Sequence, residues 1–442
     1  MPNDIIIGRD EADKKNLSDK GLIFIGKHYV KMGNTTSLSN RVFMDVARTH
    51  VILITGKRGG GKSSSIATIA EEMSNLPLEV SENLSMIIFD TMGIFWTMKF
   101  PNERDEDLLR EWNLSPKKFN VDIYVPSGHF KEYQKKGIPV DIPFTIKTSE
   151  LNADDWCNVF NVELTNNIGI LIERTLSNLE GLNYDIEKII ELIKKDKKAD
   201  ENTRNATENR FQAVKTWGLF DKNGTEINSL VKPGKTVIID LSAYTNVSGS
   251  SNIKALVISI ISKKLLVDRI DKRKIEELEA IETTESYFSI EEKKEKRKMP
   301  LVWIFLDEAH EFLKKNEKTP ATDALVQLLR EGRQPGISLV LATQQPGEIH
   351  RDVLTQTDIV ISHRITAKRD ITALNAMSQS YLIADIQRYL NELPTLKGSA
   401  IILDDNSERI YPMRVRPRLS WHGGETPSAV HVKKKELADL GL

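Results

Sequence analysis

The sequence predicts an α/β protein built around a mostly parallel β-sheet with helices on both faces. Short apolar segments alternate with longer segments of helical periodicity from residue 51 to residue 403. Because neighbouring parallel strands are joined through helices, this alternation favours a parallel sheet that is buried on both faces. A glycine-rich turn at residues 56–61 joins the first of these strands to an amphipathic helix, and it marks where the core begins.

In chain order, the predicted elements divide the sequence into five parts. Short strands and turns come first, and helical spacing dominates the middle, where Asn152 and Asp155 have the spacing of a capping box. The core strands are predicted at residues 51–55, 86–90, 121–126, 236–242, 301–308, 336–345, 358–365 and 397–403. The parts are a small N-terminal β module (1–48), the first part of the core (49–130), an inserted helical subdomain (131–232), the second part of the core (233–410) and an extended C-terminal segment (411–442).

One predicted helix is followed by an unusually charged segment. Residues 252–269 are apolar on most helical faces, which predicts a buried helix. Residues 270–299 mix Lys, Arg and Glu with few apolar positions. This composition predicts a solvated helical extension or a mobile loop, and a partner-binding arm is the alternative.

Length and composition exclude several classes of protein. The 442 residues are enough for two or three domains, and 40% hydrophobic with 28% charged residues is typical of a soluble globular protein. No apolar run reaches the length of a membrane span and no signal peptide is visible, so we expect a cytoplasmic protein without a membrane partner. The single cysteine, Cys157, excludes an intrachain disulfide and, with no Cys/His cluster, argues against structural zinc. The net charge of −1 requires any DNA-binding surface to be local.

The glycine-rich turn has the spacing of a phosphate-binding loop. Residues 51–63 read VILITGKRGGGKS, which contains G-x4-G-K-S. Glycines allow several backbone N–H groups to face phosphate oxygens, and a helix that begins near Lys62 directs its dipole at the same anions. Lys62 can reach the β- and γ-phosphates of ATP, and the Ser63 hydroxyl can bind Mg²⁺. The predicted nucleotide contacts are Gly56, Lys57, Arg58, Gly59, Gly60, Gly61, Lys62, Ser63 and Ser64.

An acid pair follows the apolar strand at residues 303–306, as in a Walker B strand. Asp307 is predicted to hold Mg²⁺ together with Ser63, and Glu308 is predicted to orient and activate the attacking water. These residues favour ATP hydrolysis over mere binding. The letters D-E-A-H at 307–310 also match a helicase box, but the companion motifs are absent from the sequence. We therefore expect His310 in the first turn of a helix, with a γ-phosphate sensor as the alternative role.

Two further catalytic candidates lie between residues 328 and 346. Gln344 ends the strand predicted beside the Walker B strand, where a polar side chain can bond the γ-phosphate or the attacking water. Arg333 and Arg330 lie near the end of the preceding helix. Phosphoryl transfer needs positive charge on the transferred group, and motors often supply it from a neighbouring subunit. Arg333 is predicted as this trans-acting arginine, and a solvent-facing charge at the helix end is the alternative for both arginines.

These residues together resemble the HerA side of the HerA–FtsK group of P-loop ATPases. The matching segments are 45–63, 87–98, 237–244, 303–313, 328–346 and 415–428. The resemblance implies a RecA-like core with an inserted helical bundle, in a homo-hexameric ring that pumps double-stranded DNA. It places Lys62, Ser63, Asp307, Glu308, Gln344 and Arg333 at the family's Walker, sensor and trans-arginine positions. It also implies that the C-terminal segment braces a neighbouring subunit.

The resemblance further implies an N-terminal β-barrel that docks a partner, which is a NurA-like nuclease or an antiviral defence effector such as a sirtuin-like NADase. Only about 50 residues precede the phosphate-binding loop, roughly half of the usual barrel, so a reduced barrel is expected. The predicted function is an ATP-driven DNA translocase or helicase. The alternative is a ring scaffold that ATP switches and that regulates an effector without pumping DNA. Lys99 and residues 131–136 are candidate DNA contacts.

Overall fold

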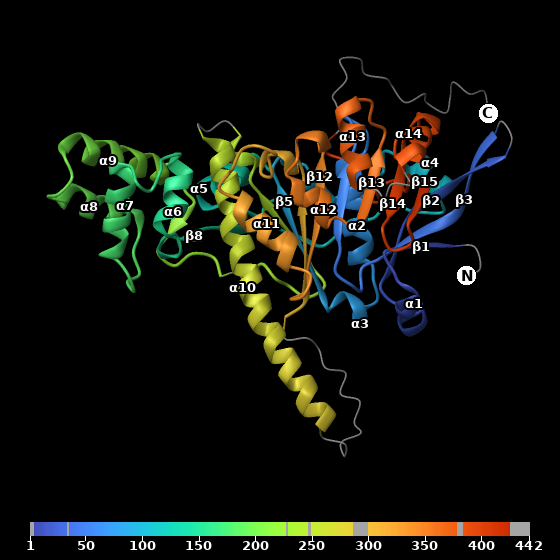
Figure 1. Ribbon diagram of the computed structural model, residues 1–442, viewed down its shortest axis with the longest axis horizontal. Helices are drawn as coiled ribbons and strands as arrows, with labels where there is room; N and C mark the ends of the chain where they lie inside the picture. The colour runs from blue at the N-terminus through green and yellow to red at the C-terminus, as the bar shows by residue number, and fades with distance from the viewer. Residues whose placement is uncertain are drawn as a thin grey trace.

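The computed structural model describes residues 4–32, 35–226, 229–245, 249–285, 299–377 and 383–424. Its main feature is a 13-stranded sheet with the strand order β1-β3-β2-β15-β14-β13-β4-β12-β11-β5-β10-β6-β7 (Figure 1). The strands from β13 to β7 in this order are parallel, and β14, β15 and β2 continue the sheet by antiparallel pairing. The predicted mostly parallel α/β fold is therefore confirmed.

All eight strands predicted for the core are present. They are β4 (Val51–Thr55), β5 (Leu84–Asp90), β6 (Val121–Pro126), β10 (Thr236–Asp240), β11 (Leu301–Leu306), β12 (Ile337–Thr343), β13 (Ile359–His363) and β14 (Ser399–Asp404). The other strands of the sheet are β1 (Ile5–Ile7), β2 (Leu22–Met32), β3 (Thr35–Asp45), β7 (Ile142–Phe144) and β15 (Arg409–Val415).

Both faces of the parallel strands are buried. In β4, Leu53 packs in the layer that contains α10 (Ser250–Glu285) and α11 (Thr322–Glu331). Its neighbours Ile52 and Ile54 pack in the opposite layer with α2 (Lys62–Ser74). Because successive side chains of a strand point to opposite faces, the continuous apolar sequences of these strands are explained by a helix layer on each side.

The remaining helices extend the two layers. α12 and α13 follow β12 and β13, and α14 packs on β14. Their bounds, with those of the shorter helices, are α1 (Glu11–Leu17), α3 (Leu78–Ser81), α4 (Glu106–Glu111), α5 (Ser127–Lys135), α12 (Arg351–Gln356), α13 (Lys368–Met377) and α14 (Ile383–Glu392).

Four helices form a separate cluster at one end of the sheet, on the left of Figure 1. The first begins at the capping box predicted from Asn152 and Asp155, which is confirmed by reciprocal side-chain to backbone hydrogen bonds. Trp156 is fully buried in this cluster and its ring centroid lies 5.0 Å from that of Phe211. The helices are α6 (Ala153–Phe160), α7 (Asn167–Ser177), α8 (Ile186–Lys195) and α9 (Glu201–Lys215), and β8 (Ile146–Lys147) pairs with β9 (Phe220–Asp221) beside them.

The helix predicted at 252–269 is confirmed and is longer than expected. α10 runs from Ser250 to Glu285, and its second half projects from the body of the molecule (Figure 1). One face of this helix is buried as far as Arg269, although Val267 on another face is exposed, and beyond Arg269 both Leu278 and Ile281 are exposed. The first part of the charged segment is thus a solvated helical extension. Residues 286–298 lie outside the described residues, and the partner-binding arm stays a prediction.

The N-terminal strands are continuous with the core sheet. β2 pairs with β3 and also with β15, where Met413 lies opposite His28. β15 belongs to the segment that was expected to be extended, and it is a strand because β14 and β2 flank it on both sides. Within the described part of the chain, no helix is long and apolar enough to cross a membrane.

The segment after β15 lies against its own chain. Arg416 and Arg418 are buried, and Ser420 forms an isolated antiparallel bridge with Pro101. Residues 416–420 are held by contacts within their own chain, and the bracing of a neighbouring subunit by this segment stays a prediction. Trp421 is 38% exposed, and residues 425–442, the rest of the expected brace, lie outside the described residues.

Candidate nucleotide-binding site

The predicted phosphate-binding loop connects the end of β4 to the start of α2, which begins at Lys62 as predicted. Gly59 and Gly61 have φ values of 74° and 115°, a region that L-residues with side chains rarely adopt. Gly56 is required for another reason, because a Cβ atom there would lie 2.6 Å from the Cβ of His363. The glycines of the motif thus allow both the turn and its close packing.

His363 packs against the loop, and no motif in the sequence predicts this role. The ring is fully buried at the end of β13, with Nε2 2.9 Å from Ser65 Oγ and Nδ1 3.1 Å from the carbonyl oxygen of Ser399. Burial lowers the pKa of His363 to about 4, so the ring is neutral. Nδ1 then donates to the carbonyl, and Nε2 accepts from the serine hydroxyl.

The structure brings the two predicted magnesium ligands together. Ser63 Oγ donates to Asp307 Oδ2 over 2.6 Å, and Asp307 is 3% exposed at the end of β11. Lys62 is also buried, and its Nζ lies 3.5 Å from the carbonyl oxygen of Lys57. A hydroxyl and a carboxylate in contact form an oxygen donor set of the kind that Mg²⁺ prefers. The roles of these side chains stay predictions.

Glu308, the predicted general base, follows Asp307 at the end of β11. It takes a left-handed backbone conformation with φ 52°, and its Oε2 is buried without a hydrogen-bond partner among the described residues. Burial and the charge of Asp307 raise the pKa of Glu308 to about 7, while Lys62 opposes this rise. A carboxyl group with this pKa can accept a proton near neutral pH.

His310 lies beside Glu308, within the short 3₁₀ helix Ala309–Glu311. The prediction that His310 lies in the first turn of a helix is thus confirmed, and the helix is of the 3₁₀ type. His310 Nδ1 lies 3.5 Å from Glu308 Oε2 and 3.2 Å from Thr343 Oγ1. Burial, assisted by Lys62, lowers the pKa of His310, which favours a neutral ring. The contact makes His310 a candidate for orienting the Glu308 carboxylate.

Gln344 follows β12, which lies between β4 and β11 in the sheet. Because these parallel strands end at the same edge, the half-buried Gln344 lies between the ends of the strands that carry the loop and the acid pair. This is the position expected of a polar sensor residue.

Arg333 lies near the start of β4, at the opposite end of this strand from the phosphate-binding loop. The carbonyl oxygen of Arg333 accepts from Thr49 Oγ1 over 3.2 Å, and Thr49 precedes β4, whereas the loop follows it. Arg333 is exposed. Arg330 forms an ion pair of 2.6 Å with Asp352. The fold therefore keeps Arg333 away from the phosphate-binding loop of its own chain.

Two more buried acids lie next to Asp307 in the sheet. Asp90 ends β5, the neighbour of β11, and it pairs in register with Asp240 at the end of β10. Burial and the charge of Asp240 raise the pKa of Asp90 to about 7. Asp90 accepts backbone N–H groups of Gly93 and Phe95, each over 2.7 Å. These contacts assign Asp90 to the turn that follows its strand.

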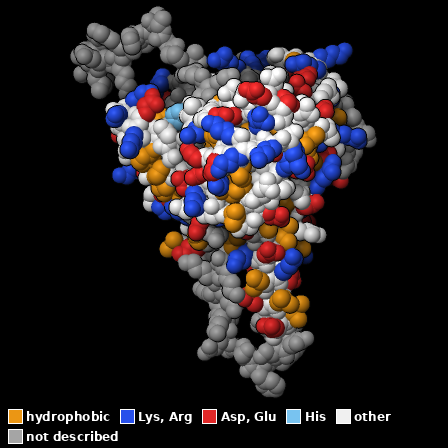
Figure 2. Space-filling view, turned by 90° about the vertical axis from the view of Figure 1, so that its left-hand side faces the viewer, with side chains coloured by type: hydrophobic (Ala, Val, Ile, Leu, Met, Phe, Trp, Pro, Cys, Tyr) orange, Lys and Arg blue, Asp and Glu red, His pale blue; other side chains and the backbone are white. Residues whose placement is uncertain are grey.

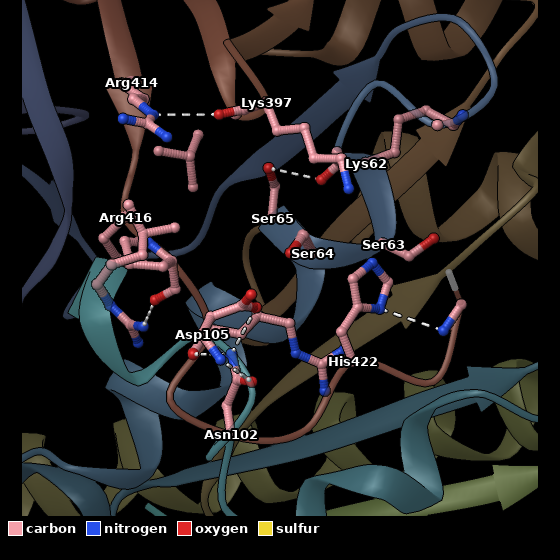
Figure 3. Close-up of a pocket in the computed structure, with 18 of the residues that line it drawn as sticks. Lys62, Ser63, Ser64, Ser65, Asn102, Asp105, Lys397, Arg414, Arg416 and His422 are labelled. Atoms are coloured by element: carbon pink, nitrogen blue, oxygen red, sulfur yellow. Dashed lines mark hydrogen bonds between the residues drawn. The ribbon is translucent and has the colours of Figure 1, made fainter. Parts of the chain in front are cut away.

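A cavity of about 610 Å³ adjoins the phosphate-binding loop (Figure 3). One wall is the loop and the start of α2, from Gly59 to Ser65. The opposite walls come from residues 102–108 and from the C-terminal residues 414–424. Of these walls, only the first was predicted as a nucleotide contact from the sequence.

The C-terminal wall is held by Glu71 of α2, which is fully buried. Its carboxylate accepts from Arg416 Nη1 over 3.0 Å, from the backbone N–H groups of Leu419 and Ser420 over 3.0 Å each, and from Ser420 Oγ. Arg418 Nε lies 3.7 Å from the same carboxylate. This network fixes the segment to the helix that follows the phosphate-binding loop.

Comparison with known proteins agrees with this geometry. The family description "Helicase HerA, central domain" matches residues 23–265, and "Helicase HerA-like C-terminal" matches residues 284–412. The chain belongs to the HerA family. It is therefore a P-loop ATPase of HerA type, as the phosphate-binding loop and the acid pair predicted.

Among its relatives in this family are two proteins named DNA double-strand break repair helicase HerA. That of Sulfurisphaera tokodaii is 24% identical over 393 residues, which cover 87% of this chain and 67% of the relative. That of Saccharolobus solfataricus is 22% identical over 403 residues, which cover 89% of this chain and 68% of the relative. This chain thus spans about two thirds of the length of either relative.

A solved structure supports the fold. VirB4 of Thermoanaerobacter pseudethanolicus matches with a TM-score of 0.51 at 12% identity, and the match covers 90% of this chain and 96% of that one. At this identity the likeness concerns the fold alone.

Proposed function

We propose that this chain is an ATP-driven motor that moves on double-stranded DNA. The observation that carries the proposal is the contact between Ser63 and Asp307 beside Glu308, within a chain of the HerA family. This arrangement can bind and hydrolyse ATP, and the HerA relatives are named as DNA repair helicases. Coupling hydrolysis to movement on DNA is the function that unites the two findings.

The residues divide the work of hydrolysis. Lys62 and the backbone of the glycine turn hold the β- and γ-phosphates. Ser63 and Asp307 would hold Mg²⁺, which neutralises phosphate charge when bound. Glu308 accepts the proton of the attacking water, and His310 keeps the Glu308 carboxylate in place through its 3.5 Å contact. Gln344 orients the water or the γ-phosphate.

Arg333 completes the site of a neighbouring subunit in a homo-hexameric ring. Its place at the end of the strands opposite its own loop, together with its exposure, supports action in trans. A subunit interface that places Arg333 against the next phosphate-binding loop would supply the missing positive charge. Closed symmetric rings repeat such a head-to-tail contact at every interface.

The ring would bind DNA through local basic surfaces. Figure 2 faces the helical insertion and shows basic and acidic side chains interspersed there, in agreement with ion pairs such as Lys194 with Glu208. This face is therefore a poor DNA surface. Of the predicted contacts, Lys99 is paired with Asp141 over 2.6 Å, whereas Lys131 and Lys135 on α5 are exposed. We favour α5 of the two candidates.

The experiment that tests the proposal is ATP hydrolysis with and without duplex DNA of two unrelated sequences, across a salt titration. We expect both duplexes to stimulate ATP hydrolysis and the stimulation to weaken as the salt concentration rises, because a motor binds phosphates rather than base edges. Stimulation by only one of the two sequences would contradict the proposal.

The alternative is a ring scaffold that ATP switches and that regulates a partner enzyme. We propose the N-terminal strands β1–β3 as the docking surface, with a NurA-like nuclease or a defence effector such as a sirtuin-like NADase as partner. A stable complex with such an enzyme would favour the scaffold if DNA changed neither the formation of the complex nor its rate of ATP hydrolysis.

A further inference from the structure

We propose that Arg269 of α10 is a positioning residue for Arg333. It fixes the turn at residues 332–336, so that the exposed Arg333 side chain is presented in one place to the active site of a neighbouring subunit. This inference rests on the proposed action of Arg333 in trans. It adds a residue of another element that cannot itself reach a neighbouring subunit, because Arg269 is fully buried.

Arg269 holds the turn through the backbone of Pro335. Its Nε donates to the carbonyl oxygen of Pro335 over 2.7 Å, and its Nη1 donates to the carbonyl oxygen of Met299 over 3.0 Å. One side chain thus joins three segments: α10, the residues just before the strand that leads to Asp307, and the turn that carries Arg333. A buried carbonyl group that lost this donor would be left without a hydrogen bond, which is costly.

The turn itself has a sequence that allows movement and a path that runs close to Arg269. Residues 332–336 read Gly-Arg-Gln-Pro-Gly. Gly336 has a φ of 95°, and a Cβ atom there would lie 3.2 Å from Arg269 Nη2. Thr49 also bonds this turn, at the carbonyl oxygen of Arg333, but that contact is exposed to water. The buried contact with Arg269 is therefore the stronger constraint on the turn.

Glu276 fixes the orientation of the Arg269 guanidinium. Its Oε1 accepts from Arg269 Nη1 over 3.1 Å, and it lies on the half of α10 that projects from the body of the molecule (Figure 1). The carboxylate offsets the cost of burying the positive charge. An apolar side chain could fill the same space without that cost. The ion pair and the two carbonyl contacts instead give the guanidinium, and with it the turn, a single position.

The position of the turn matters for catalysis because Pro335 is only two residues from Arg333. An arginine supplied in trans must meet the charge that develops on the transferred phosphoryl group, and a misplacement of about 1 Å can cost about a hundredfold in rate. A turn released from Arg269 would hold Arg333 in several positions. The expected signature is a loss of kcat with ATP binding preserved, because the arginine acts mainly in the transition state.

The first measurement is kcat and the Kd for ATP in the full chain. Arg269→Met removes the donors and keeps an unbranched side chain, whereas Arg269→Lys keeps the charge and one donor group. We expect kcat to fall about tenfold or more in Arg269→Met and about threefold or more in Arg269→Lys, with Kd within about twofold of wild type. Arg174→Met is the matched control, because Arg174 pairs with Asp196 on the helical insertion, and it should keep wild-type kcat.

Mixed rings separate the positioning of Arg333 from a general loss of structure. Arg269→Met subunits should regain activity with Glu308→Gln subunits, because the first supply an intact Glu308 and the second supply a correctly held Arg333. They should gain none with Arg333→Ala subunits, since no interface then has a working arginine. If thermal unfolding shows that Arg269→Met does not fold, Arg269→Lys takes its place in both mixtures.

Two results would overturn the inference. One is kcat within about twofold of wild type in every Arg269 variant that folds, while Arg333→Ala is inactive. The other is a gain of activity with Arg333→Ala subunits, or no gain with Glu308→Gln subunits, since either places the defect outside the turn that carries Arg333. Wild-type kcat in Arg333→Ala would instead refute the proposed role of Arg333 in trans, so the two failures are distinguishable.

Discussion

Asp307 and Glu308 are adjacent carboxylates with different environments. Asp307 Oδ2 accepts a hydrogen bond from Ser63 Oγ over 2.6 Å, whereas Glu308 Oε2 is buried without a hydrogen-bond partner among the described residues. The contact with Ser63 suits a metal ligand, and burial raises the pKa of Glu308 to about 7. Two adjacent carboxylates in such different environments can provide a metal ligand and a base within one site.

Replacing Glu308 by Gln should abolish turnover and preserve ATP binding. The amide keeps the size of the side chain but cannot accept the proton of water, and the phosphate contacts remain. Steady-state hydrolysis and equilibrium ATP binding measure the two effects. Lys62→Ala is the comparison variant, which should lose turnover by weakening phosphate contacts. Hydrolysis above about a tenth of wild type in Glu308→Gln would contradict its role as base.

The rate of hydrolysis should rise with pH through about 7. The pKa of Glu308 is raised above its ordinary value of 4.5, so the group is protonated and inactive as a base at pH 6 and ionised at pH 8. One unit below the pKa, roughly a tenth of the sites are ionised. The measurement is kcat/KM between pH 5.5 and 8.5, because this ratio reports the pKa values of the ligand-free enzyme. A flat profile over this range would show that another group limits turnover.

At the scale of elements, the sequence predicts those strands and helices that are determined by interactions between residues close together in the chain. The eight core strands and the start of α2 follow from apolar runs, glycine spacing and helix periodicity, so they were found in the sequence. His363 was not, because it reaches Ser65 from 298 positions away. The contact between Glu71 and Arg416 spans 345 positions, and the pairing of β15 with β2 is also distant in sequence. Such contacts depend on the completed sheet order, which no single segment encodes.

The Glu71 network should contribute strongly to stability. Glu71→Gln removes the carboxylate that faces the buried Arg416 and Arg418, which leaves buried positive charge with less compensation. We expect the free energy of unfolding to fall by about 3 kcal/mol. Glu79→Gln is the matched control, since Glu79 forms an exposed pair with Lys20 worth at most about 1 kcal/mol. Denaturant unfolding curves compare the two variants, and equal effects would contradict the structural role of the network.

At the scale of the whole molecule, one sheet connects all the proposed working parts. The strand that carries the phosphate-binding loop lies near its centre, the N-terminal strands extend one end, and the helical insertion adjoins the other (Figure 1). Arg333 and the loop lie at opposite ends of the strands of this sheet. A subunit with its phosphate-binding loop and Arg333 at opposite ends of the strands is suited to a ring. In such a ring, each subunit would contribute Arg333 to the active site of the next.

Mixed rings test whether Arg333 acts in trans. Neither Arg333→Ala nor Glu308→Gln subunits should hydrolyse ATP alone. In a mixed ring, some interfaces combine an intact Arg333 from one subunit with an intact Glu308 from the next, so partial activity should return. Hydrolysis is measured over a series of mixing ratios, with mixed assembly verified by differently tagged subunits. No recovery at any ratio would argue for a role in cis or for none.

Movement along duplex DNA can be observed by displacement of a third strand. The substrate is a duplex that carries a short triplex-forming strand at one end, incubated with the chain, ATP and Mg²⁺. We expect wild-type protein to release the third strand at a rate that depends on ATP, and Glu308→Gln protein to bind the duplex without releasing it. Wild-type protein that binds the duplex and hydrolyses ATP on it, yet never displaces the third strand, would contradict the proposal of a DNA motor.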